Sequence, residues 1–114
     1  MSLILVSDVP SINPKQVKEK FDERSDFILL DVREDNEVAF CRIEGSTHIS
    51  VSSFQSQFMN LPKDREIIVY CHTGMRSSMV TSFLLQQGFQ KVSNMYGGID
   101  LWSLEIDSKV PRYT

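Results

Sequence analysis

A cysteine and an arginine with four residues between them follow an apolar run at 67–70, in the segment Cys71-His72-Thr73-Gly74-Met75-Arg76-Ser77. If the run is a strand and a helix begins near Ser77, the turn between them aims several main-chain N–H groups at the cysteine. The helix N-terminus adds a partial positive charge, and Arg76 adds a full one. Ser77 is expected to cap the helix. Such a loop stabilises an anionic sulfur, so Cys71 is predicted to be a nucleophile.

The length of this loop distinguishes between two anions that it could hold. Cysteine-dependent phosphatases resemble it but have five intervening residues, which would place the arginine at position 77, where this chain has Ser77. The shorter loop closes a smaller ring, which suits one sulfur atom better than a tetrahedral phosphate. The spacing therefore favours a persulfide on Cys71, and a phosphatase or an arsenate reductase is the less favoured alternative.

Short apolar runs alternate with amphipathic stretches on both sides of this loop. Strands are expected at 27–32, 47–51, 67–70 and 91–95. Helices are expected from an Asn13 cap to Phe21, over 35–40 and 54–61, from about Ser77 to a glycine stop at Gly88, and after Gly97-Gly98. This alternation predicts a mainly parallel α/β sheet with helices on both faces. Ligands bind at the carboxyl ends of strands in such sheets, and Cys71 follows one of those ends.

The whole-chain composition narrows the function classes. The 114 residues are the size of one domain, and a single domain over 1–114 is predicted. A net charge of -3 without a Lys/Arg-rich run argues against nucleic acid. No apolar run approaches transmembrane length, so no membrane association is expected. Two cysteines are too few for a disulfide-stapled secreted domain, so we expect reduced thiols in the cytoplasm.

Three motifs in order resemble those of the rhodanese family. The first is 30–34 with 43–49, the second is the loop at 71–77, and the third is 96–102. The resemblance extends from about Ile12 to Tyr113. It implies a three-layer α/β rhodanese-like domain with a five-stranded parallel sheet flanked by helices. It also implies a sulfurtransferase reaction in two displacements: a donor passes sulfane sulfur to Cys71, and a thiol, cyanide or a protein acceptor then removes it.

The resemblance also implies residue roles. Cys71 and Arg76 would be catalytic, with Arg76 stabilising the thiolate and helping to bind an anionic donor. The substrate-binding residues would be those of the rest of the loop: His72, Thr73, Gly74, Met75 and Ser77. Family members often have a basic residue where this chain has His72, so its rim is less cationic than in good thiosulfate users. A protein persulfide or a small-thiol persulfide is therefore as plausible a donor as thiosulfate, and no cofactor is implied.

Asp31 and Arg33 stand at the end of another strand. We interpret them as a structural ion pair at the strand–helix junction that supports the site; the alternative is that Asp31 orients Arg76 or Arg33 beside the loop. Among the other charged residues, three carboxylates are expected to be solvated: Asp35, Glu37 and Glu44. Trp102 is expected in the core.

Cys41 follows a polar stretch without a glycine turn, so we interpret it as a packed thiol rather than a resolving cysteine. His48 is expected to be a hydrogen-bonded structural residue. A metal site built from Cys41, His48, Cys71 and His72 is not predicted, because Cys71 and His72 are adjacent, unlike the ligands of structural zinc sites. His72 is either a proton shuttle or a rim residue. A sulfur-relay or docking module with little small-molecule turnover stays open beside the enzyme.

Overall fold

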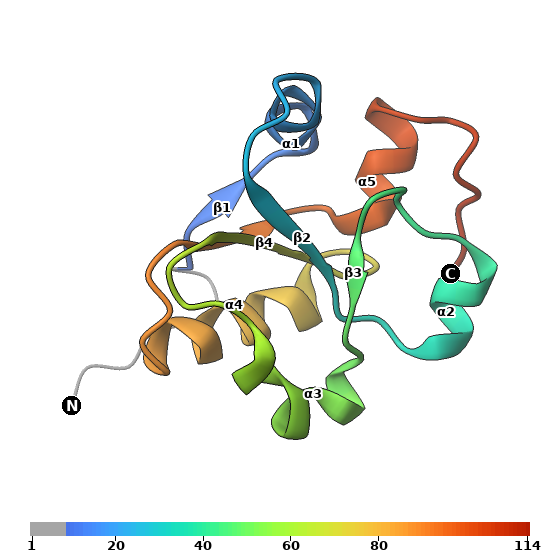
Figure 1. Ribbon diagram of the computed structural model, residues 1–114. Helices are drawn as coiled ribbons and strands as arrows, with labels where there is room; N and C mark the ends of the chain where they lie inside the picture. Colours follow the sequence, from blue (N-terminus) through green and yellow to red (C-terminus); the bar gives the residue numbers. More distant parts are fainter. Residues whose placement is uncertain (1–8) are drawn as a thin grey trace.

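The computed structural model describes residues 9–114, which form five strands and five α-helices (Figure 1). The strands are β1 (Ser11–Ile12), β2 (Phe27–Asp31), β3 (Thr47–His48), β4 (Glu66–Tyr70) and β5 (Val92–Met95). The helices are α1 (Pro14–Asp22), α2 (Asp35–Phe40), α3 (Val51–Gln57), α4 (Met75–Gln86) and α5 (Gly98–Glu105), and a 3-10 turn, η2 (Phe58–Asn60), follows α3.

All five strands belong to one parallel sheet in the order β1-β5-β4-β2-β3, which confirms the predicted fold class. The central strand β4 has every residue from Ile67 to Tyr70 buried. Parallel strands covered on both faces are typically continuous apolar runs, as this one is. The nucleophile candidate therefore follows the most enclosed strand of the sheet.

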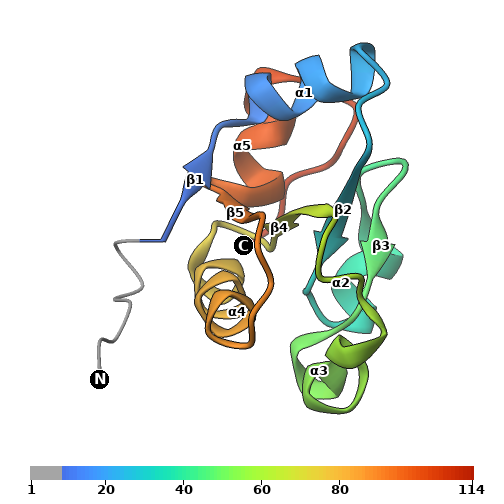
Figure 2. The same cartoon turned by 60° about the vertical axis from the view of Figure 1, so that its left-hand side comes forward.

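Helices cover both faces of the sheet (Figures 1 and 2). On one face, α1 and α5 bury Val17, Ile99 and Trp102 against the sheet, which confirms Trp102 as a core residue. On the other face, α3 and α4 form a second core cluster that includes Phe54 and Val80 and reaches Cys71. Among the residues described, no helix is both long and apolar enough to span a membrane.

Besides shifts of one residue at the ends of β2, β4 and β5, the elements differ from the sequence prediction at β1, after β3 and at the start of α4. Strand β1 was not predicted, because two residues are too few to show an alternating pattern. The segment after β3 becomes helical at Val51, so the expected strand to residue 51 is too long. Helix α4 begins at Met75, with Gly74 as its N-cap in the left-handed region at φ 111°. The prediction that Ser77 caps α4 is therefore wrong: Ser77 lies within the first turn.

Candidate active site

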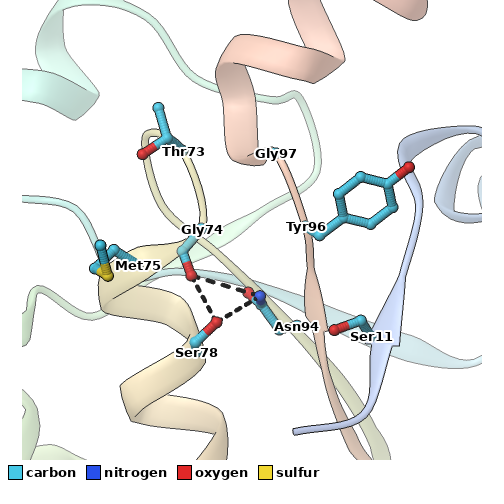
Figure 3. A pocket seen from close by; sticks show the side chains of 8 residues that line it. All are labelled: Ser11, Thr73, Gly74, Met75, Ser78, Asn94, Tyr96 and Gly97. Carbon is cyan, nitrogen blue, oxygen red and sulfur yellow. Dashed lines mark hydrogen bonds between the residues drawn. The ribbon is translucent and has the colours of Figure 1, made fainter. Parts of the chain in front are cut away.

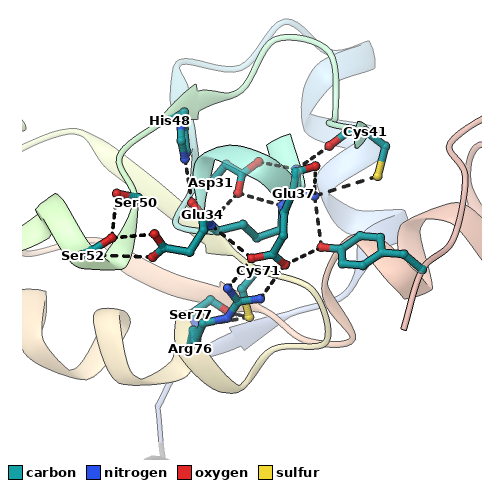
Figure 4. Close-up of polar contacts among 12 residues, drawn as sticks. Asp31, Glu34, Glu37, Cys41, His48, Ser50, Ser52, Cys71, Arg76 and Ser77 are labelled. Carbon is teal, nitrogen blue, oxygen red and sulfur yellow. Dashed lines mark hydrogen bonds and ion pairs between the residues drawn. The ribbon is translucent and has the colours of Figure 1, made fainter. Parts of the chain in front are cut away.

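The sulfur of Cys71 lies under the start of α4, within hydrogen-bond distance of two main-chain N–H groups and one hydroxyl. The main-chain N–H of Gly74 lies 3.1 Å from Sγ and that of Ser77 lies 3.4 Å away. The Ser77 hydroxyl is 3.3 Å from Sγ, and Figure 4 shows Ser77 beside the sulfur. Donors on several sides stabilise an anionic sulfur better than a neutral thiol. The residue is 1% exposed, so its access to solvent is restricted.

The start of α5 fixes the direction of the loop's peptide groups. The carbonyl oxygen of Cys71 accepts from the N–H of Ile99 at 2.9 Å, and that of His72 accepts from the N–H of Asp100 at 3.1 Å. The described chain has no cis peptide bond, and in a trans peptide the N–H points opposite to the carbonyl. The N–H groups of His72 and Thr73 therefore point away from α5, toward the face of the sheet where Cys71 Sγ lies.

These loop N–H groups are available for an additional atom. Within residues 9–114, the main-chain N–H groups of His72, Thr73, Met75 and Arg76 make no hydrogen bond to another protein group. Unpaired N–H groups at a helix N-terminus form a site that attracts anions. The loop can thus hold an anion above Cys71 as well as the sulfur of the cysteine itself.

Two glycines let the loop and the α5 start come together. A Cβ on Gly98, at φ 59°, would overlap the carbonyl oxygens of both Cys71 and His72. Gly74 makes a similar close approach, since a Cβ on it would lie 3.4 Å from the main-chain nitrogen of Gly97. The motif at 96–102 thus supports the loop at 71–77 through direct backbone contact.

A buried polar pair extends from Ser77 to β5. The Ser77 hydroxyl donates to Oδ1 of Asn94 at 2.5 Å, or to Sγ of Cys71, and it has one proton for the two acceptors. The amide nitrogen of Asn94 donates to the hydroxyl of Ser78 at 2.8 Å. Asn94 is 3% exposed and was not singled out in the sequence, because a lone asparagine within a short strand gives no signal.

Arg76 is engaged by a carboxylate. Its two terminal nitrogens donate to the two carboxylate oxygens of Glu37 at 2.6 and 2.9 Å (Figure 4). These hydrogen bonds lower the pKa of Glu37 to about 2 against the opposing effect of burial. The expectation that Glu37 is a solvated charge is therefore wrong. The Glu37 side chain is 15% exposed, and it neutralises the cation that was expected to face the donor.

Asp31 and Arg33 form a fully buried ion pair beside this site. Nε and one terminal nitrogen of Arg33 donate to the two oxygens of Asp31 at 3.0 and 2.6 Å. The guanidinium also donates to the carbonyl of Cys41, while Asp31 accepts from the Tyr70 hydroxyl at 2.7 Å. Burial is the largest single effect and lowers the pKa of Arg33, but the hydrogen bonds to Asp31 and Tyr113 and the charge of Asp31 together outweigh it, so the net effect is a raised pKa. Neither residue contacts Arg76.

The C-terminal segment brings in a residue that the sequence analysis did not assign to the site. The Tyr113 hydroxyl donates to Glu37 at 2.8 Å and accepts from Arg33 at 3.2 Å, so it links the two ion pairs. Burial raises its pKa to about 12, so it keeps its proton at neutral pH. In the sequence, Tyr113 is marked only by its position at the end of the stretch that resembles the rhodanese family.

The remaining predicted residues lie around the loop. His48 contacts the carbonyl oxygen of Arg33 through Nε2 at 2.6 Å, in a structural position. Thr73, Gly74 and Met75 line a cavity of about 570 Å³ on the outer side of the loop, toward β1 and β5 (Figure 3). Cys41 and Cys71 are both free thiols, and no group of three or more metal-ligating side chains occurs within residues 9–114.

Comparisons with known proteins show the family to which the chain is similar. The model of the rhodanese-like domain family matches residues 13–105. The Bacillus subtilis (strain 168) protein YtwF is 36% identical over 102 residues, which cover 90% of this chain and 98% of YtwF. The thiosulfate sulfurtransferase GlpE of Pseudoalteromonas translucida is 32% identical, over 79% of this chain and 86% of GlpE. The crystal structure of a rhodanese-related protein from Thermoplasma volcanium has a TM-score of 0.76 at 31% identity, covering 90% of this chain and 95% of its own.

Proposed function

Because the chain belongs to the rhodanese-like domain family, and its relatives support a sulfurtransferase-type enzyme, we propose that it carries sulfane sulfur as a persulfide on Cys71. The observation that supports this most is the set of unpaired N–H groups from His72 to Arg76 above a sulfur that already accepts from Gly74 and Ser77. One added sulfur atom bound to Sγ would meet those donors, and its negative charge would be stabilised by them.

The transfer takes two steps. The thiolate of Cys71 attacks the outer sulfur of the donor, the donor's bond to that sulfur breaks, and the electron pair leaves with the remainder of the donor. An acceptor thiolate or cyanide then attacks the outer sulfur of the persulfide, and Cys71 departs as a thiolate. The hydrogen bonds of the loop to sulfur stabilise the anion both before and after each step.

Intact-mass measurement tests the persulfide directly. Incubation with a sulfane-sulfur donor, followed by removal of excess donor, is expected to add one sulfur atom to the protein, and cyanide is expected to remove it. Cys71→Ser should gain no sulfur, whereas the matched variant Cys41→Ser should gain it as the wild type does. Absence of the adduct with every donor, or its persistence in Cys71→Ser, would contradict the proposal.

A relay module is a second candidate, favoured by the 1% exposure of Cys71, which restricts access from solvent. Such a module would give slow turnover with small acceptors and fast transfer to one protein thiol. Phosphate transfer is disfavoured by the geometry of Arg76, because both of its terminal nitrogens are held by Glu37 instead of facing the loop. We also infer a reducing compartment such as the cytoplasm, since both cysteines are free thiols.

A further inference from the structure

The loop is surrounded by arginines whose charges are already compensated. Arg76, Arg33 and Arg112 each make a two-point ion pair with one carboxylate: Glu37, Asp31 and Asp100, respectively. Asp100 lies in the first turn of α5 and binds the loop carbonyl of His72 through its N–H. A guanidinium paired in this way has little free capacity for a second anion. The loop N–H groups therefore stand among ion pairs that are neutral overall.

An apolar cavity adjoins Arg76. It has a volume of about 280 Å³ and lies between α3 and α4, where Val51, Phe54, Met79 and Phe83 line it. Arg76 is its only charged lining residue. Arg76 belongs to the loop segment 71–77 and also lines the cavity, so the cavity adjoins one side of the loop. With Arg76 neutralised, this cavity suits an apolar group better than a charged one.

We propose that Glu37 is a specificity-determining residue. By occupying Arg76 it removes the cation that would bind a dianionic donor, and it leaves a site suited to a monoanionic sulfane-sulfur donor whose other end is apolar. This inference rests on the proposed persulfide chemistry at Cys71. It reverses the role expected for Arg76, because the guanidinium serves as the partner of Glu37 and not as a donor-binding charge.

Two donors that deliver sulfane sulfur by the same reaction differ in charge, so comparing them tests how the site recognises the charge of the donor. Thiosulfate is a dianion, and benzenethiosulfonate is a monoanion in which a phenyl group replaces one charged oxygen. Cys71 thiolate attacks the outer sulfur of either donor, and the donor's S–S bond breaks. The electron pair leaves with sulfite in one case and with benzenesulfinate in the other, and both reactions give the same persulfide. The kcat/KM ratio of the two donors, with cyanide as acceptor, therefore reports on donor recognition.

The wild type is expected to prefer benzenethiosulfonate. Glu37→Gln frees Arg76 and is expected to raise kcat/KM for thiosulfate by at least about tenfold relative to benzenethiosulfonate, the size of one hydrogen-bonded charge contact. The double variant Glu37→Gln with Arg76→Gln should lose that gain. The matched control is Asp26→Asn, which changes the net charge equally and frees Arg65 at the opposite ends of the strands. It should leave the ratio unchanged.

A second pair of variants tests the apolar cavity without touching Glu37. Met79→Gln, at a cavity residue that is 57% exposed, is expected to lower kcat/KM for benzenethiosulfonate by about fivefold while leaving thiosulfate unchanged. Met59→Gln, at an exposed methionine outside the cavity, should change neither.

The inference is overturned if the kcat/KM ratio of the two donors is unchanged in both Glu37→Gln and Met79→Gln. It is also overturned if Asp26→Asn shifts this ratio as much as Glu37→Gln does. Neither result affects the proposal of a persulfide on Cys71. Failure of the wild type to take up sulfur from either donor would instead overturn the proposed function. Circular dichroism of each variant separates a change in recognition from a loss of folding. If Glu37→Gln does not fold, the Met79 and Met59 pair decides the question.

Discussion

The imidazole ring of His72 stacks on the phenol ring of Tyr113, with centroids 4.0 Å apart and 14° between the ring planes. The stack joins the residue after Cys71 to one near the end of the sequence. Through its hydroxyl, the same tyrosine contacts Glu37 of α2 and Arg33 after β2. The C-terminal segment thus packs against the loop and against both ion pairs beside it, and it helps to fix their positions relative to one another.

Acid should weaken the fold partly through Glu37. Its pKa is lowered from 4.5 to about 2, chiefly by the hydrogen bonds from Arg76, so the unfolded chain takes up this proton at a higher pH than the folded one. The stabilisation is therefore complete above pH 4.5 and is lost as the pH falls toward about 2. Urea unfolding at a series of pH values should show a smaller loss of unfolding free energy in Glu37→Gln than in the wild type. Equal losses would show that another group is responsible.

Removing Asp31 should be costly, because Arg33 would be left as a buried cation. The two residues are 0% exposed and are paired at 2.6 and 3.0 Å. Asp31→Ala is expected to lower the unfolding free energy by about 3–5 kcal/mol in urea titrations. The exposed pair of Arg65 and Asp26 provides the contrast, where Asp26→Ala should cost less than about 1 kcal/mol. Similar losses at the two sites would contradict the importance of burial.

Ser77→Ala should slow sulfur uptake without preventing it. The variant removes the hydroxyl 3.3 Å from Sγ but keeps the N–H donors of Gly74 and Ser77. One lost hydrogen bond to an anion corresponds to a decrease of about tenfold or more in the rate of persulfide formation. Thr81→Val deletes a hydroxyl one turn later that bonds only the helix backbone, and it should keep the wild-type rate. A rate in Ser77→Ala equal to that of Thr81→Val would count against the contact.

Gly98→Ala should displace the nucleophile loop. Its Cβ would overlap the carbonyl oxygens of Cys71 and His72, in addition to the strain of φ 59°. Gly88→Ala imposes a comparable strain at φ 92°, but its Cβ would meet only the end of the Lys63 side chain, 3.8 Å away. We expect Gly98→Ala to abolish persulfide formation in the intact-mass assay, while Gly88→Ala loses stability and keeps sulfur uptake. Sulfur uptake by Gly98→Ala at the wild-type rate would show that the loop tolerates the displacement.

The sequence pattern predicted four of the five strands and the position of the Cys71 loop at the end of β4, but not the surroundings of Arg76. The apolar runs at β2 and β4 and the cysteine–arginine spacing are local signals, and each is read within a few residues. Glu37 instead belongs to a short polar helix, α2, in which no residue is buried, so its pattern resembles that of a solvated helix. Its contact with Arg76 arises only because α2 packs across the end of the sheet. Tyr113 and Asn94 were missed for the same reason, since their partners lie far away in the sequence.

The two hydrogen bonds from the α5 start to the loop have a consequence for how this scaffold could change its chemistry. A residue inserted between Cys71 and His72 would separate the two carbonyls that the N–H groups of Ile99 and Asp100 bind. At least one of those donors would then be left without an acceptor at a buried junction, which is costly in free energy. A residue inserted after Thr73 leaves both hydrogen bonds in place. The α5 start therefore confines any change in the size of the anion that the loop can hold to the second half of the loop.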